Sequence, residues 1–296
     1  MMKAFSRKPH WLKTPLPQGN GFAELEQKLK KNSLATVCQE ALCPNKSECW
    51  SARTATIMIL GDTCTRACKF CHVKTGNPKG LINPQEIEDT LKMIEIMSLK
   101  YVVITSVDRD DLPDFGANHF AAVVKAVHYH FPETKVEVLI PDFNVDEFAM
   151  DTLASSNPFV IGQNLETVRR LTHPVRDPRA SYEKTLNALK YYKKKFPSII
   201  TKSSLMLGLG ETRQELLESF KDLKEAGVDI LTIGQYLRPS RRHLSVEKYY
   251  HPDEFVELKQ LAYQEGFLFV AAGPLVRSSY KAAEFLDFIE NRSLSC

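Results

Sequence analysis

The chain has no long hydrophobic run and no large excess of charge of either sign. Its 296 residues include 39 Lys and Arg and 36 Asp and Glu, so the net charge is only +3. That balance gives no electrostatic reason to expect nucleic acid as a partner. The ten-residue stretch FLFVAAGPLV is far shorter than the ~20 apolar residues that a membrane helix needs. The N-terminus has no apolar signal-peptide segment, and we therefore expect neither export nor a membrane partner.

Cysteine is also scarce, but its distribution is uneven. Six of the seven cysteines lie between residues 38 and 71, in two groups of three. The first group is Cys38, Cys43 and Cys49, and the second is Cys64, Cys68 and Cys71. Thiols stay reduced inside a cell, so such crowding indicates a metal site or catalysis rather than disulfide bonds. We expect a cytoplasmic bacterial protein, with the mitochondrial matrix as the alternative compartment.

From residue 55 onward, apolar runs alternate with amphipathic patterns. The apolar runs predict strands over 55–61, 101–106, 135–140, 158–163, 199–210, 229–235 and 267–273. The amphipathic patterns predict helices over 83–100, 116–131, 144–156, 181–196, 211–227 and 251–266. Buried strands separated by helices are typical of a parallel α/β sheet. Six or seven such units favour a partial (β/α)6-type TIM barrel over a doubly wound sheet.

The second cysteine group directly follows the first predicted strand, on the face where barrel enzymes carry their chemistry. A zinc site with His72 as fourth ligand is disfavoured, because Cys71 and His72 are consecutive. The Cys-x-x-Cys-His pattern of covalent haem attachment needs an exported protein and leaves Cys64 unexplained. An iron–sulfur cluster fits better, since three thiolates on four irons leave one iron open for a ligand.

The spacing Cys64-x3-Cys68-x2-Cys71, with Phe70 before the last cysteine, resembles the signature of the radical S-adenosylmethionine (SAM) superfamily. The resemblance implies a 4Fe–4S cluster that binds SAM at its open iron, in a partial barrel of the radical SAM type. It also implies that Phe70 packs near the adenine of SAM. The alternative role for Phe70 is an ordinary core aromatic.

The first group, Cys38-x4-Cys43-x5-Cys49, is similar to that of the lipoyl synthase family. The similarity extends along most of the chain, through VVITSVDRDDLPDFGA, DILTIGQYLRPSRRHL and GPLVRSSYKAAEF. It implies a second, auxiliary 4Fe–4S cluster whose fourth ligand is a serine of the RSSY motif, assigned to Ser279 with Ser278 as fallback. The local alternative is that this serine caps the following helix.

The reaction implied by this resemblance is the insertion of two sulfur atoms, at C6 and C8, into an octanoyl chain bound to a lysine. The auxiliary cluster would be the sulfur donor and would be consumed. No catalytic residue beyond the cluster ligands is implied. The implied partners are octanoylated lipoyl carrier domains (2-oxoacid dehydrogenase acyltransferase subunits and the glycine cleavage carrier protein), reduced ferredoxin or flavodoxin, and iron–sulfur repair proteins.

Several further residues follow predicted strands. The resemblance places Ser106, Asn164 and Glu166 near the polar groups of SAM, with a helix N-cap as the alternative for the last two. Asp108, Asp110 and Asp111 are interpreted as loop caps, and Asp108 is also a candidate for contact with the polar groups of SAM. Phe115 occupies a turn position where family members usually have glycine, which leaves the local backbone shape open. Lys202 is either a SAM- or carrier-orienting cation or a structural ion-pair partner.

We expect three segments: an N-terminal arm and auxiliary-cluster segment over 1–54, the radical SAM partial barrel over 55–272, and a C-terminal segment with the serine ligand over 273–296. Two other functions stay open. One is a different two-cluster radical SAM sulfur-transfer enzyme of the methylthiotransferase kind, and the other is a non-catalytic zinc protein.

Overall fold

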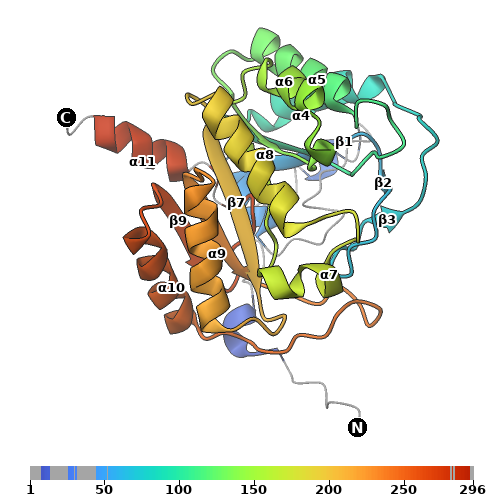
Figure 1. Cartoon of the computed structure of the whole chain (residues 1–296). Helices are drawn as coiled ribbons and strands as arrows, with labels where there is room; N and C mark the ends of the chain where they lie inside the picture. Colours follow the sequence, from blue (N-terminus) through green and yellow to red (C-terminus); the bar gives the residue numbers. More distant parts are fainter. Residues whose placement is uncertain are drawn as a thin grey trace.

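The structure, a computed structural model, describes residues 8–13, 26–29, 31, 45–51, 53–280, 282 and 284–293. Seven of its strands form one parallel sheet in the order β1-β4-β5-β6-β7-β8-β9 (Figure 1). These strands are Thr54–Ile59 (β1), Tyr101–Ser106 (β4), Lys135–Leu139 (β5), Val160–Gly162 (β6), Ile200–Leu207 (β7), Ile230–Gln235 (β8) and Phe269–Gly273 (β9). Two short strands, Thr63–Cys64 (β2) and Lys74–Thr75 (β3), pair separately. The sheet ends at β1 and β9, so the barrel is open.

Helices join consecutive strands and cover the outer face of the sheet. The long ones are Gln85–Met97 (α4), Ala117–His130 (α5), Glu147–Ala154 (α6), Tyr182–Lys195 (α8), Arg213–Glu225 (α9), Pro252–Gln264 (α10) and Glu284–Ser293 (α11). The short ones are His10–Leu12 (η1), Lys46–Ser51 (α3), Phe143–Val145 (η2), Arg169–Leu171 (η3) and Thr172–Val175 (α7). Figure 1 shows α8 and α9 lying over β7. Each strand from β1 to β8 in the large sheet is followed by a helix, which confirms the partial (β/α)6-type barrel, and β9 adds a seventh strand.

Side chains alternate between the two faces of each strand, as the period of a strand requires. On β4, Val102 and Ile104 join the core beneath α4 and α5. The alternate residues, Tyr101 and Val103, face the interior of the barrel and form a small cluster with Ala282 of the C-terminal segment. Because these parallel strands are buried on both faces, each appears in the sequence as a nearly continuous apolar run, and this is why the sequence predicted them well.

The C-terminal segment enters the open barrel. The carbonyl of Val276 lies against Gly234 of β8, where any Cβ atom would come within 2.0 Å of its oxygen. Further along, Phe285 of α11 packs against Val160 and Ile230 at the start of their strands. The absence of a side chain at Gly234 is therefore what admits this segment.

The interior also contains a buried ion pair near the N-terminal ends of the strands. The Lys202 ammonium lies 2.7 Å from Glu137, and the Tyr101 hydroxyl donates to the same carboxylate at 2.8 Å. All three residues are almost fully buried. Of the two roles considered for Lys202, the structure supports the structural ion-pair partner.

Two details of the turns differ from a simple strand–helix alternation. Phe115 has φ = 55°, so it takes the left-handed conformation that glycine would adopt without strain. Gly116 follows with φ = 86°, and a Cβ there would approach Leu60 to 2.5 Å. The turn keeps a glycine-like backbone although phenylalanine occupies one position.

None of the helices in the described part of the chain is long and apolar enough to span a bilayer.

Candidate active site

The second cysteine group lies on the cluster loop, which we define as residues 61–76 between β1 and α4. Cys64 ends the short strand β2, which pairs with β3 at the end of the same loop. The backbone amide of Gly76 donates to the Cys64 carbonyl at 2.9 Å, and that of Cys71 donates to Cys68 at 3.1 Å. These local bonds fold the loop back on itself. All three thiols are half-buried at the C-terminal edge of the sheet.

The thiols of Cys64 and Cys68 contact polar groups of the protein. The backbone amide of Asp177 lies 3.3 Å from the Cys68 sulfur, and that of Arg66 lies 3.4 Å from the Cys64 sulfur. The Cys64 thiol also points to the Asp108 carboxylate, 3.8 Å away. Burial, with the Asp108 charge as a smaller cause, raises the pKa of Cys64 to about 12. Burial likewise raises the pKa of Cys68 to about 11 and that of Cys71 above its ordinary value.

Thiols in such surroundings are protonated at neutral pH unless a metal displaces the proton. The Cys71 charge contributes to the raised pKa of both Cys64 and Cys68, so the three sulfurs share one neighbourhood. Within the described residues, no three His, Cys, Asp or Glu side chains converge as the ligands of a single metal ion do. A donor set of three thiolates suits iron–sulfur clusters, which hold their ligands on separate irons and so farther apart than one ion does.

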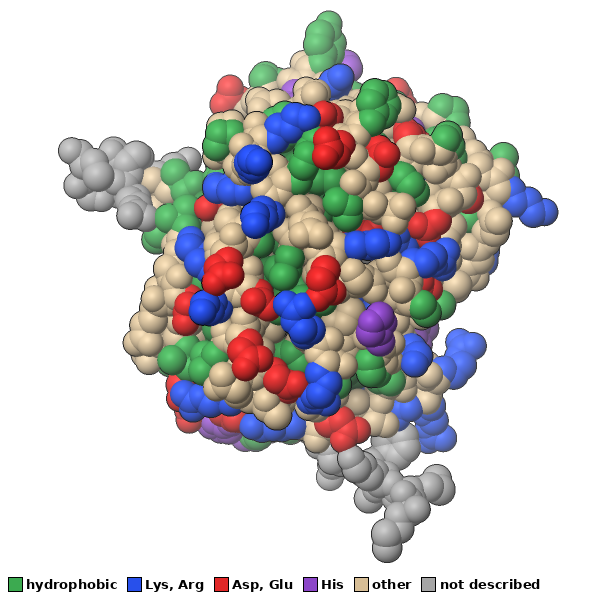
Figure 2. All heavy atoms as spheres, in the orientation of Figure 1, with side chains coloured by type: hydrophobic (Ala, Val, Ile, Leu, Met, Phe, Trp, Pro, Cys, Tyr) green, Lys and Arg blue, Asp and Glu red, His purple; other side chains and the backbone are tan. Residues whose placement is uncertain are grey.

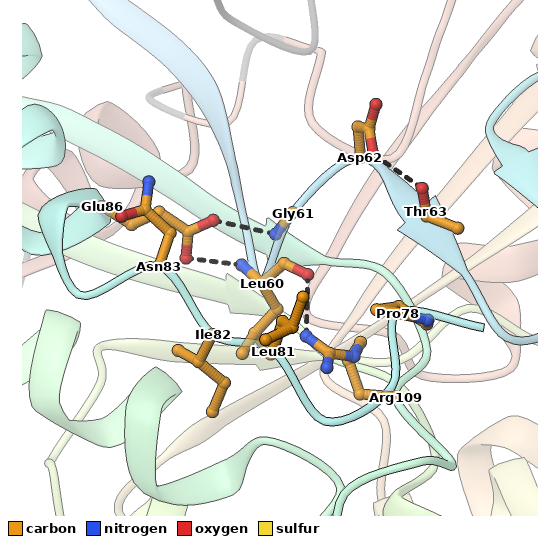
Figure 3. A pocket seen from close by; sticks show the side chains of 10 residues that line it. All are labelled: Leu60, Gly61, Asp62, Thr63, Pro78, Leu81, Ile82, Asn83, Glu86 and Arg109. Carbon is orange, nitrogen blue, oxygen red and sulfur yellow. Dashed lines mark hydrogen bonds between the residues drawn. The ribbon is translucent and has the colours of Figure 1, made fainter. Parts of the chain in front are cut away.

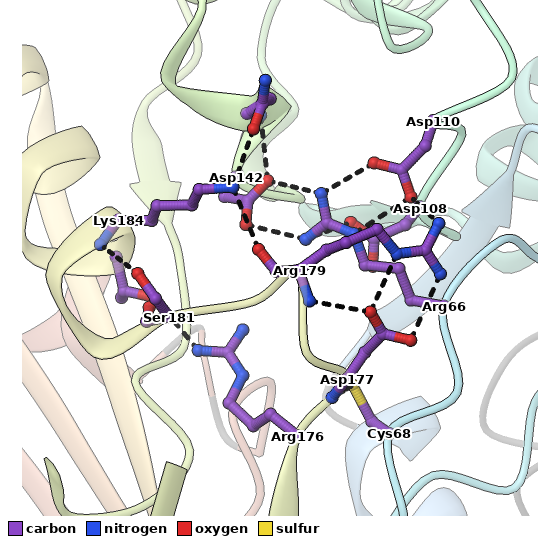
Figure 4. A network of polar contacts seen from close by, with 12 residues as sticks. Arg66, Cys68, Asp108, Asp110, Asp142, Arg176, Asp177, Arg179, Ser181 and Lys184 are labelled. Carbon is purple, nitrogen blue, oxygen red and sulfur yellow. Dashed lines mark hydrogen bonds and ion pairs between the residues drawn. The ribbon is translucent and has the colours of Figure 1, made fainter. Parts of the chain in front are cut away.

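A dense polar network supports the cluster loop from one side (Figure 4). The Arg66 guanidinium lies among Asp108, Asp110 and Asp142. Arg179 pairs with Asp177 at 2.9 Å, and Asp177 accepts the backbone amide of Ala67 at 2.8 Å.

The three aspartates after β4 are therefore ion-pair partners, which corrects their interpretation as loop caps. Asp108 and Asp110 pair with Arg66, and Asp111 pairs with the buried Arg109 at 2.8 Å. Asp111 also accepts a hydrogen bond from the backbone amide of Gly80, and this contact does resemble the predicted loop cap. Burial raises the pKa of Asp108 to about 6, because Arg66 compensates its charge only in part.

Two of the predicted SAM contacts lie together next to the thiols. The Asn164 amide donates to Glu166 at 3.1 Å, and Glu166 adopts φ = 72°. Burial raises the pKa of Glu166, and its charge contributes to the raised pKa of Cys71. The alternative role of these residues as a helix N-cap is wrong, since the next helix begins at Arg169 without a side-chain cap.

The other two residues predicted to contact SAM, Ser106 and Phe70, have no contact with the thiols that the structure identifies. The Ser106 hydroxyl is buried at the end of β4 and has no hydrogen-bond partner in the structure. An orphaned hydroxyl at this edge is consistent with a contact to a bound polar ligand. Phe70 is half-buried against the core around β7 and β8, so its contact with adenine stays a prediction.

Sequence reasoning missed two polar residues at the same edge. Arg176, which is half-buried, follows α7, and its charge acts on Cys68, Asp108 and Glu166. Gln163 follows β6 and is buried, and neither of its amide atoms has a partner in the structure. Arg176 is identified by the charges around it and Gln163 by its unsatisfied amide, and neither signal can be read from the sequence.

The loop after β8 covers the opposite side of the cluster loop. His243 Nε2 lies 3.0 Å from the Cys71 carbonyl oxygen, and the Leu244 amide donates to the Lys69 carbonyl at 3.4 Å. The His243 ring lies 5.5 Å from the ring of His72, measured between centroids. His72 is thus on the exposed outer side of the loop rather than among the sulfurs.

A cavity of about 310 Å³ lies at the end of β1, beside the start of the cluster loop (Figure 3). The Glu86 carboxylate accepts the backbone amides of Leu60 and Gly61, both at 2.8 Å. Arg109 donates to the Leu60 carbonyl at 3.2 Å. These bonds terminate β1 and fix the point at which the loop leaves the sheet.

Of the first cysteine group, only Cys49 belongs to the described residues; Cys38 and Cys43 lie outside them. Cys49 is buried on α3. Two long-range hydrogen bonds join α3 to the C-terminal segment: Asn45 donates to the Leu275 carbonyl at 2.6 Å, and Tyr280 donates to Glu48 at 2.8 Å. Cys49 and the RSSY motif are thus brought to one region. Helix α11 begins at Glu284, so Ser278 and Ser279 are not its N-cap.

Figure 2 shows acidic and basic side chains interspersed on one face of the molecule. The ion pairs made by α8 include Arg169 with Glu183 and Lys195 with Asp151.

Known proteins match this chain along its length. A model of the radical SAM superfamily matches residues 58–223, and a model of the N-terminal domain of lipoyl synthase matches residues 2–43. Lipoyl synthase of Thermus thermophilus is 58% identical over 93% of this chain and 85% of its own length. Lipoyl synthase of Ectopseudomonas mendocina is 53% identical over 95% of this chain and 80% of its own length.

Among solved structures, Streptococcus suis SuiB bound to S-adenosylmethionine superposes with a TM-score of 0.57 at 13% identity, over 85% of this chain and 61% of that chain. That likeness supports the fold. Together, the open parallel barrel, the three-thiol loop after its first strand and the superfamily match define a radical SAM enzyme. Within that superfamily, the chain belongs to the lipoyl synthase family. It is a sulfur-inserting enzyme that uses S-adenosyl-L-methionine and 4Fe–4S clusters.

Proposed function

We propose that this enzyme inserts two sulfur atoms, at C6 and C8, into an octanoyl chain carried on a lysine of a lipoyl carrier domain. The observation that carries this proposal is the three-thiol loop at the C-terminal edge of the barrel, in a chain with a second cysteine group. A radical generator alone needs one such group. A second group is accounted for if one cluster starts the reaction and the other supplies sulfur.

We assign Cys64, Cys68 and Cys71 as ligands of the SAM-binding cluster. When bound there, SAM supplies a carbon radical that can take a hydrogen atom from an unactivated C–H bond. The chain's own groups orient the cofactor: Asn164, Glu166 and Ser106 offer polar contacts, and Phe70 offers an apolar surface for adenine. The convergence of Glu166 with Cys71 supports this set.

We assign Cys38, Cys43, Cys49 and Ser279 as ligands of the auxiliary cluster. The bonds from Asn45 to Leu275 and from Tyr280 to Glu48 support the pairing of Cys49 with the RSSY segment. An alkoxide is a harder ligand than a thiolate and matches iron–sulfur chemistry less well, so its iron can be released first. That property suits a cluster that is dismantled to give up sulfur.

This division matches three segments: residues 1–54 carry most of the auxiliary site, residues 55–272 form the barrel, and residues 273–296 provide the serine. The partners follow from the chemistry. An octanoylated carrier domain delivers the substrate, with 2-oxoacid dehydrogenase acyltransferase subunits and the glycine cleavage carrier as candidates. Reduced ferredoxin or flavodoxin supplies electrons, and iron–sulfur repair proteins rebuild the consumed cluster.

The test is to separate the two sites by substitution. Anaerobically reconstituted wild-type chain should hold about eight iron atoms and Cys49→Ala about four, because each cubane has four. Cys49→Ala should still cleave SAM but insert no sulfur into an octanoyl-lysine peptide. Cys64→Ala should lose SAM cleavage and retain the other cluster. Sulfur insertion that survives in Cys49→Ala would show that the division of roles is wrong.

The same measurements test the other functions. One or two zinc atoms without iron would identify a zinc protein, whose ligands would be these same thiols. A methylthiotransferase-like enzyme would bind both clusters but leave the octanoyl peptide unchanged. The match to lipoyl synthases over more than nine-tenths of the chain favours the octanoyl substrate over both.

A further inference from the structure

One arginine of the cluster loop has no role in the chemistry described above. Arg66 lies between Cys64 and Cys68 in the sequence, yet its side chain points away from solvent into the polar network of Figure 4. Its residue exposure is only 5%. A buried cation two residues from one cluster ligand and two from the next calls for a physical explanation.

The guanidinium of Arg66 makes four hydrogen bonds and one further ion-pair contact. Nε and Nη2 bind Asp110 at 3.1 and 2.8 Å, and Nη1 and Nη2 bind Asp142 at 2.7 Å each. Nη1 also lies 3.2 Å from a carboxylate oxygen of Asp108. Two forked pairs and one single ion-pair contact therefore surround the group.

These carboxylates come from different parts of the sheet edge. Asp108 and Asp110 follow β4, and Asp142 follows β5. Arg66 itself belongs to the loop after β1, next to β4 in the sheet. One side chain thus ties the loops after three adjacent strands together. The other flank of the cluster loop is fixed by Asp177, which binds the Ala67 amide and donates its own amide to Cys68.

Stability alone does not account for this arrangement. Removing an arginine and its carboxylates from water costs about as much as their attraction returns, so a buried ion pair is weak evidence of stabilisation. The charges here are not balanced either, because three arginines, Arg66, Arg179 and the more distant Arg176, face four carboxylates, those of Asp108, Asp110, Asp142 and Asp177. The guanidinium instead fixes the geometry of the loop. Its planar fork pairs with a carboxylate in a single orientation, so each forked pair sets how the two side chains lie relative to one another.

We propose that Arg66 is a positioning residue that holds Cys64 and Cys68 at the spacing required by the SAM-binding cluster. The proposal rests on the assignment of Cys64, Cys68 and Cys71 as ligands. The residue acts through backbone geometry: Arg66 anchors the loop at its centre, and Thr65 is fixed beside it by the Asp110 carboxylate at 2.7 Å. A lysine at this position keeps the charge but has no planar fork, so it cannot form the two bidentate pairs.

The experiment compares Arg66→Lys with Arg109→Lys in the reconstituted full chain. Arg109 is the matched control, because it is also buried and forks onto Asp111, but it holds only the residue before the cluster loop, through the Leu60 carbonyl, and lies outside the stretch between Cys64 and Cys68. Arg66→Lys should retain about four iron atoms instead of about eight, with the auxiliary cluster still loaded. The electron paramagnetic resonance signal of the reduced protein should also lose its response to added SAM. Arg109→Lys should retain both clusters and that response.

A second variant covers the case in which Arg66→Lys fails to fold. Asp142→Asn keeps the acceptor for the Asn144 amide but removes one forked pair from Arg66. In the metal-free chain, it should increase hydrogen exchange at the Thr65 and Ala67 amides about tenfold, since their loop loses an anchor. Unchanged exchange there, or normal loading of both clusters in Arg66→Lys, would overturn the proposal. If Cys64→Ala instead retained both clusters, the ligand assignment would fail rather than the role of Arg66.

Discussion

The two cysteine groups are built in contrasting ways. The cluster loop carries its three thiols within eight residues, and its own short ladder of β2 and β3 closes it. The proposed auxiliary site draws on α3 and on the segment after β9. Two hydrogen bonds join these segments, and their partners are 230 and 232 positions apart in the sequence. The first site is therefore specified mainly by local sequence and the neighbouring strand ends. The second, as proposed, forms only when segments from both ends of the chain have come together.

This difference fits the roles proposed for the two sites. A cluster that is reused at every turnover benefits from ligands on a rigid loop, held by buried charges. A cluster that is consumed and rebuilt needs ligands that can separate without unfolding the barrel. The expected consequence is that changes to the C-terminal segment affect sulfur insertion before they affect SAM cleavage.

The largest effect is expected from Gly234→Ala. The new Cβ would lie 2.0 Å from the Val276 oxygen, so the segment leading to Ser279 must move. Sulfur insertion should fall about 10²-fold while SAM cleavage changes little, because small misplacements of a reacting group are costly. Gly162→Ala is the control, since its Cβ would meet only ordinary contacts of 3.5 Å or more on a neighbouring strand. Equal loss of both activities in Gly234→Ala would contradict the separation of the two sites.

The next effect concerns α11. Phe285 is 2% exposed and packs its ring near Phe159, Phe269 and Phe288. Phe285→Ala should lower the free energy of unfolding by about 3–5 kcal/mol, as expected for a fully buried aromatic. Urea denaturation measures this. Phe148→Ala should change it by less than about 0.5 kcal/mol, because Phe148 is 72% exposed. Similar values for the two variants would mean that α11 is not anchored by this ring.

The smallest effect tests the turn that supports the cluster loop. At Gly116, φ is positive and an added Cβ would come within 2.5 Å of Leu60. Gly116→Ala should therefore lower the free energy of unfolding by about 2–3 kcal/mol. Gly80→Ala has a similar φ of 72° but no atom within 4 Å of the new Cβ, so it should cost only about 1 kcal/mol. Thermal unfolding of both variants separates conformational strain from steric contact. Equal losses would show that Leu60 moves aside freely.

Much of the fold could be predicted from the sequence, because its signals are local. Apolar runs buried on both faces located all seven strands of the sheet, and the strand over 101–106 has the predicted bounds. The cysteine spacing located the site for the same reason, since its ligands lie on one loop. The short strands β2 and β3 were not predicted, because two-residue strands leave no periodicity to detect.

The contacts that shape the site could not be predicted. The bond between Arg66 and Asp142 spans 76 positions, and no pattern in either loop reveals the other. Lys202 was ambiguous for a similar reason, because its partner Glu137 is on another strand. The N-cap interpretations of Asn164 and Ser279 failed because capping chemistry describes residue types, whereas the chain continues for several residues before a helix begins.

The open barrel has one further consequence. A parallel sheet that stops at β1 and β9 has two edge strands, neither of which pairs with a further strand on its outer side within the described part of the chain. Helix α3 lies beside β1, and its neighbour Asn45 reaches the backbone just beyond β9. The segments that carry ligands thereby also shield the seam from other molecules, and we expect chains in which this shield is displaced to self-associate, as light scattering would detect.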